Sequence, residues 1–99
     1  MTVLIAGTVR VPPENLERFR PHMEAMLAAS RAEDGCLDYA YALDLIEPGL
    51  VRVSERWTDR ASLEAHFRTA HMATWRQALA GQVRERDIKL YEAGDGESF

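Results

Sequence analysis

"LVRVSERWTDRASLEAHFRTAHM", residues 50–72, is the stretch that decides the fold, because a strand pattern in it passes directly into a helix pattern. Its first half alternates, so one face of the predicted strand carries Val51, Val53, Glu55 and Trp57. Asp59 then stands where a side chain can accept from the free N–H groups of a first helical turn. The helical stripe that follows is Leu63, His66, Phe67 and Ala70. This stretch therefore predicts a half-buried strand followed at once by a capped helix.

The rest of the chain supplies the partners of these two elements. The expected elements are a strand at 2–11, a helix that opens at Pro12 and Pro13 and runs to about Asp34, a strand from Cys36, a turn at 47–49, a further helical run from Met72 to Ala80 and a strand at 82–93. The order strand, helix, strand, strand, helix, strand is the split βαβ arrangement of an α+β, ferredoxin-like domain. We expect one domain at 1–93 and a polar tail at 94–99.

Composition and charge narrow the classes of partner. The 99 residues are 46% hydrophobic and 28% charged, which fits one domain with an ordinary core. A net charge of −4 without a basic cluster argues against nucleic acid or an anionic membrane as a partner. No signal peptide or membrane anchor is recognisable at the N-terminus, and a single cysteine suits a reducing compartment, so we expect a cytoplasmic protein. Because so short a chain buries a small share of its surface, a homodimer is expected.

Two histidines are the candidate reactive groups of the opening stretch. On a continuous helix His66 and His71, five positions apart, would be separated by about 140°, so we expect no shared metal ion. His66 occupies the apolar stripe, where a hydrophobic residue would be usual. A histidine there could serve as base, acid or hydrogen-bond donor to a ligand. The alternative is a core histidine whose nitrogens bond to the backbone or to water.

Glu55 and Trp57 share one face of the predicted strand. A carboxylate beside an indole on an inward face is costly to bury unless it is paired with another group or with a ligand. The chain has no Gly-rich phosphate loop and no serine nucleophile motif, so neither a nucleotide cofactor nor serine chemistry is predicted. Glu55 is therefore a candidate pocket residue, whereas Trp57 fits packing as well as a pocket.

Several short motifs resemble those of the antibiotic biosynthesis monooxygenase family, most closely its small quinol monooxygenases. They are Glu55-x-Trp57-x-Asp59, Leu63-Glu64-Ala65-His66, His71-Met72 and, upstream, Glu33-Asp34-Gly35-Cys36 with Tyr39. The resemblance implies ferredoxin-like protomers whose sheets pair face to face in a dimeric α/β barrel, each with a pocket between sheet and helices. It also implies oxidation of a quinol or phenolic substrate by O₂, with no flavin, haem or metal.

The resemblance also implies site residues. His66 and Trp57 are expected to be catalytic, His66 as base or hydrogen-bond partner and Trp57 as the residue that positions substrate or O₂. The expected substrate pocket consists of Glu55, Tyr39, Tyr41, Thr8, Leu63 and His71. No cofactor is expected, and O₂ is the co-substrate. Two other functions stay open: a dimeric small-molecule binding or stress-response module without turnover, and an isomerase of a small phosphorylated dione like the autoinducer-2-modifying branch, which shares the His66 and His71 pattern.

Overall fold

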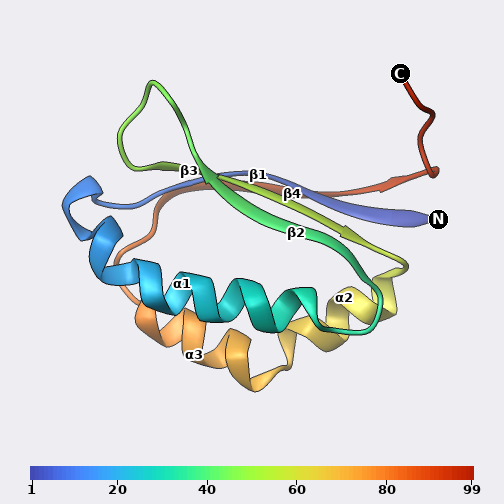
Figure 1. The fold of residues 1–99 in the computed structure, drawn as a ribbon, viewed down its shortest axis with the longest axis horizontal. Helices are drawn as coiled ribbons and strands as arrows, with labels where there is room; N and C mark the ends of the chain where they lie inside the picture. The colour runs from blue at the N-terminus through green and yellow to red at the C-terminus, as the bar shows by residue number, and fades with distance from the viewer.

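The computed structural model describes residues 1–99 as a four-stranded antiparallel sheet with helices on one face (Figure 1). The elements are β1 (Thr2–Arg10), a 3-10 turn (Pro13–Asn15), α1 (Leu16–Arg31), β2 (Cys36–Leu43), β3 (Leu50–Trp57), α2 (Arg60–Phe67), α3 (Ala70–Ala78) and β4 (Arg84–Ala93). The strand order across the sheet is β2-β3-β1-β4. The predicted α+β, ferredoxin-like order is confirmed, and no helix or strand follows Ala93.

The core lies between the sheet and the helical layer. In β3 the predicted alternation is confirmed, because Val51, Val53, Glu55 and Trp57 are all buried. The neighbouring β1 is paired so that Val3 faces Trp57 and Ile5 faces Glu55 across the ladder, which places both strands' apolar residues on the same side. The helices contribute Met26, Leu63, Met72 and Trp75 to the same cluster. The buried face of β1 and β3 is therefore the surface on which the helices pack.

Two chain junctions meet at one end of the sheet. Asp59 caps α2, since its Oδ1 accepts from the Ser62 N–H at 2.8 Å, as the sequence predicts. Gly35, between α1 and β2, has a φ of +83°, and a Cβ there would lie 2.3 Å from the Ser62 Oγ. Only glycine fits so close an approach in that conformation. The turn after α1 is thus packed directly against the start of α2.

A break separates α2 from α3. Thr69 caps α3 by accepting from the Met72 N–H at 3.3 Å, and its hydroxyl donates to the His66 carbonyl at 2.8 Å. The chain therefore turns between Phe67 and Ala70, and α3 leaves in a new direction (Figure 1). The break places the residues of α3 differently from a single continuous helix.

The other face of the sheet carries no helix (Figure 1). Leu4, Ala6 and Thr8 of β1 lie on this open face, because they alternate with the buried Val3, Ile5 and Val9. None of the helices is both long enough and apolar enough to cross a membrane. The molecule is therefore a two-layer structure with one sheet face uncovered.

Candidate functional site

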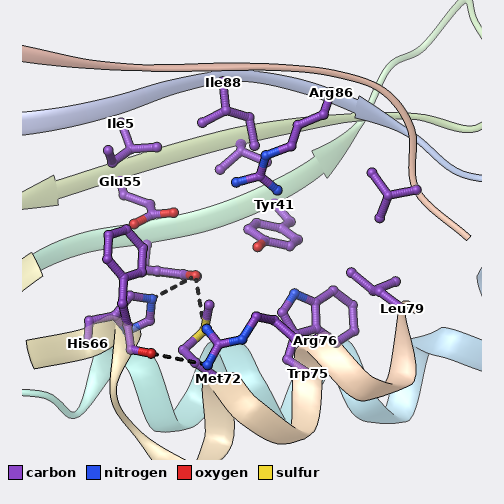
Figure 2. A pocket seen from close by; sticks show the side chains of 14 residues that line it. Ile5, Tyr41, Glu55, His66, Met72, Trp75, Arg76, Leu79, Arg86 and Ile88 are labelled. Carbon is purple, nitrogen blue, oxygen red and sulfur yellow. Dashed lines mark hydrogen bonds between the residues drawn. The ribbon is translucent and has the colours of Figure 1, made fainter. Parts of the chain in front are cut away.

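A cavity of about 280 Å³ lies between the sheet and the helical layer formed by α2 and α3 (Figure 2). Ten of its fourteen lining residues are hydrophobic, so a ligand would lose most of its hydration there. The lining residues are Ile5, Tyr39, Tyr41, Val53, Glu55, His66, Phe67, Met72, Trp75, Arg76, Leu79, Val83, Arg86 and Ile88. Aromatic walls with a few polar groups are typical of a site for a small organic ligand.

Glu55 is the one carboxylate on the cavity wall. Its Oε1 accepts a hydrogen bond of 3.0 Å from the Trp57 Nε1–H, two residues along the same strand face. Its Oε2 accepts no further hydrogen bond within 3.5 Å, although the residue is only 7% exposed. Burial raises the pKa of Glu55 above that of an ordinary glutamate, whereas the nearby Tyr39 hydroxyl and Arg86 charge act to lower it. A buried carboxylate with one fixed and one free oxygen is suited to taking a proton from a ligand.

Tyr39 and His66 form the second polar group of the cavity. The Tyr39 hydroxyl lies 3.2 Å from His66 Nε2, and both side chains are completely or almost completely buried. Burial raises the pKa of Tyr39 and lowers the pKa of His66. Both shifts favour neutral side chains, so the tyrosine O–H donates to the imidazole nitrogen. The Tyr39 oxygen keeps lone pairs that can accept a hydrogen bond from a ligand.

Glu33 completes a network behind His66. Its Oε2 lies 2.5 Å from His66 Nδ1 and 2.8 Å from His71 Nε2. An ionised carboxylate only accepts hydrogen bonds, so both imidazoles donate to it, and His66 is held in the tautomer that accepts from Tyr39. A chain of hydrogen bonds therefore runs from the cavity through Tyr39, His66 and Glu33 to the partly exposed His71.

The break between α2 and α3 makes this network possible. The expectation that the two histidine rings face different ways is wrong, because it assumed one continuous helix. Glu33, His66 and His71 bring their donor atoms within 4.8 Å of one another, a spacing compatible with a divalent cation. In the structure, hydrogen bonds from both rings to Glu33 already provide each of these atoms with a partner.

Comparison with known proteins identifies the family. The model of the antibiotic biosynthesis monooxygenase family matches residues 2–78. The chain belongs to this family. The resemblance that the sequence motifs indicated is thereby confirmed.

Related proteins and solved structures agree with this assignment. The chain is 33% identical to Escherichia coli (strain K12) "Probable quinol monooxygenase YgiN" over 70 residues, which cover 63% of the chain and 67% of that protein. It is 26% identical to the Synechocystis protein sll1783 over 98 residues, 98% of the chain and 67% of that protein. A Deinococcus radiodurans structure, 27% identical, superposes with a TM-score of 0.86 over 100% of this chain and 98% of that one.

Four of the site residues expected from the sequence come together in the structure of this family member. Tyr39, Tyr41, Glu55 and His66 all line the cavity. Trp57 does not line it; the indole is 0% exposed in the core and acts on the cavity by holding Glu55. Its predicted contact with substrate or O₂ would require the structure to rearrange.

Three other residues expected in the pocket do not line this cavity. Leu63 is buried in the core beneath α2 and does not line the cavity. Thr8 lies on the open face of the sheet, because β1 turns its odd-numbered residues inward. His71 lies outside the cavity and contacts Glu33.

Sequence reasoning also missed residues of this site. Glu33 belongs to the motif that carries the family resemblance, but no spacing rule links it to His66, which is 33 positions away. Arg86 on β4 and Arg76 on α3 line the cavity as well. The alternation of β4 could have indicated Arg86, since Ile88 and Leu90 lie on the same strand face.

Proposed function

We propose that this protein is a cofactor-independent monooxygenase that oxidises a phenol or quinol with O₂. The observation that carries the proposal is the apolar cavity whose buried end holds two proton-accepting groups, Glu55 and the Tyr39–His66 pair. Membership of a monooxygenase family and similarity to a protein named as a quinol monooxygenase support it. The apolar, aromatic lining favours an aromatic substrate over a small hydrophilic dione.

The proposed reaction begins with removal of the substrate's phenolic proton. Glu55 Oε2 takes this proton, while the Tyr39 oxygen accepts a hydrogen bond that orients the ring. The electron-rich phenolate then passes an electron to O₂, and the radical pair recombines at a ring carbon that carries hydrogen, ortho or para to the oxygen. One oxygen atom becomes a new carbonyl, and the other leaves as water with the hydrogens of the phenolic O–H and the ring C–H. A phenol and O₂ thus give a quinone and water, and a quinol and O₂ give a hydroxyquinone and water.

Each protein group has a defined part in this scheme. Trp57 holds Glu55 in place through the indole N–H. His66 serves as hydrogen-bond partner of Tyr39, since both of its ring nitrogens are already bonded. His66 therefore acts on the substrate only through Tyr39, whose hydroxyl it holds in place, so it is a positioning residue and not the base itself. The apolar lining keeps water from the radical pair.

O₂ consumption with a panel of phenols and reduced naphthoquinols, without added metal or flavin, tests the proposal. We expect turnover by the wild type and a fall in kcat of about 100-fold or more in Glu55→Gln, because a general base contributes at least that much. Glutamine keeps an acceptor for Trp57 but takes no proton. Glu64→Gln, an exposed glutamate on α2, is the matched control and should keep full activity.

The same assay tests the part of His66. His66→Gln should lower kcat less than Glu55→Gln does, and should change the pH profile. Equal rates for His66→Gln and wild type, from mildly acidic to mildly alkaline pH, would remove His66 from the mechanism. Absence of turnover with every substrate, together with tight binding of phenols, would instead favour the binding module without turnover.

A further inference from the structure

Arg86 points a positive charge into the cavity from the sheet (Figure 2). In the β1–β4 ladder Ile88 is paired with Gly7 and Leu90 with Ile5, so these two residues and Arg86 share the helix-facing side. An apolar residue would be usual at that position. Arg86 makes no hydrogen bond or ion pair with any group of the chain. Its guanidinium is therefore available to a ligand.

Arg76 reaches the same cavity from the helical layer (Figure 2). Its one hydrogen bond is donated to the Phe67 carbonyl at 3.2 Å, which orients the side chain across the end of α2. A guanidinium carries five N–H donors, so most of those of Arg76 stay free. Two cationic side chains, one from each layer, thus border one cavity.

Four of the other nine arginines form an ion pair with a carboxylate, whereas Arg76 and Arg86 form none. Arg10, Arg20, Arg52 and Arg60 each form an ion pair with a glutamate or aspartate. The chain has sixteen acidic residues against twelve basic ones, so carboxylates are in excess. Even so, none lies within ion-pair distance of Arg76 or Arg86.

The cavity is polarised along its depth. Glu55, Tyr39 and His66 are buried, whereas Arg76 and Arg86 are exposed and so border the side that meets solvent. A ligand that satisfies both ends has a hydroxyl at the buried end and an anionic group at the solvent side. Guanidinium groups match planar carboxylates in shape, since they can donate two parallel hydrogen bonds.

We propose that Arg76 and Arg86 form a carboxylate-binding subsite, so that the substrate is a phenol or quinol carrying a carboxylate remote from its reactive hydroxyl. This inference rests on the proposed function in that it calls the ligand a substrate. Binding of a carboxylate by the two arginines does not require turnover. The carboxylate would set the direction in which the ring enters, so that the hydroxyl reaches Glu55 and Tyr39. A neutral phenol would bind more weakly and in more than one orientation.

Anaerobic isothermal titration calorimetry with 6-hydroxy-2-naphthoate and its methyl ester tests the subsite, because the two differ only in the charge at one end. We expect the wild type to bind the acid about 10-fold or more tightly than the ester, the scale of a charge-assisted hydrogen bond. Arg76→Gln/Arg86→Gln should remove this preference and leave ester binding almost unchanged. Arg18→Gln/Arg68→Gln, at two exposed arginines outside the cavity, is the control for loss of two charges and should keep the preference.

The outcomes separate the subsite from the proposed reaction. Equal binding of acid and ester to the wild type, no binding of either, or an equal loss of both in the double variant would overturn the subsite. Arginine-dependent binding of the acid without O₂ consumption by any phenol would support the subsite and overturn the oxygenase. With turnover, the double variant should raise KM for carboxylated substrates far more than it lowers kcat.

Discussion

At the scale of single residues, burial shifts the pKa of two side chains that line the cavity. Glu55 is drawn toward its protonated form and His66 toward its neutral form, in both cases because a charge is poorly solvated there. Glu33 opposes this effect at His66, but burial has the larger influence on its pKa. The charged groups around His66 are Glu33, His71 and Arg76. Burial therefore favours the uncharged forms of both side chains.

His66 should make stability depend on pH with a definite sign. Its pKa is lower in the folded protein than in the unfolded chain, so the unfolded state binds more protons as the pH falls through the ordinary histidine range. The free energy of unfolding should be highest above that range and decrease on acidification through it. Urea denaturation at a series of pH values measures the slope.

Two histidine variants make that measurement specific. His66→Gln should flatten the slope in the histidine range, even though it lowers stability at every pH. His22→Gln, at an exposed position on α1, should keep the wild-type slope. An unchanged slope in His66→Gln would contradict the argument.

At the scale of elements, junctions place the reactive groups. Asp59 begins α2, Thr69 begins α3, and the turn at Gly35 brings Glu33 to the ends of both helices. The helix break is set by local capping, yet its effect is that His71 and His66 reach the same carboxylate oxygen. Small changes at these junctions should therefore disturb the hydrogen bonds of Glu33 with His66 and His71.

Gly35→Ala should destabilise the fold more than a change at another glycine with positive φ. Alanine in a left-handed conformation costs about 1–3 kcal/mol, and at Gly35 its Cβ would also overlap Ser62. Gly81 is the matched control, since its φ is +76° and nothing lies within 4 Å of its Cβ position. Urea denaturation should show the larger loss for Gly35→Ala. Equal losses would mean that the packing against Ser62 is unimportant.

At the scale of the whole molecule, the uncovered sheet face calls for a partner. We propose that a second copy covers it, as the family resemblance implies and as a short chain with an open sheet face favours. The face carries small side chains such as Ala6 on the central strand β1, which permit close approach of a second sheet.

Light scattering after size exclusion should give twice the mass of one chain. Ala6→Arg should shift the protein toward the monomer, because a long charged side chain at the centre of the face prevents packing. Ala61→Arg places the same side chain on the exposed side of α2 and should leave the dimer intact. A wild type that is monomeric at every concentration would sink this proposal.

The periodicity of the chain was enough to predict most of the fold. The alternation of β3, the cap at Asp59 and the order of the elements follow from local physical preferences, which depend on residues close in sequence. The same locality explains the failures at the site. Only the resemblance places Thr8 in the pocket, and the turn at Thr69 changes the direction in which His71 points.

The sequence by itself therefore determined the family, the architecture and an inward carboxylate and histidine in the right elements. Only the tertiary structure decided which groups meet: Glu33 with both histidines, Trp57 with Glu55, and two arginines at one cavity. The physical reason is the separation along the chain of the residues that interact. Strand and helix patterns arise from neighbours along the chain, whereas hydrogen bonds between residues 33 or 38 positions apart depend on how the layers pack.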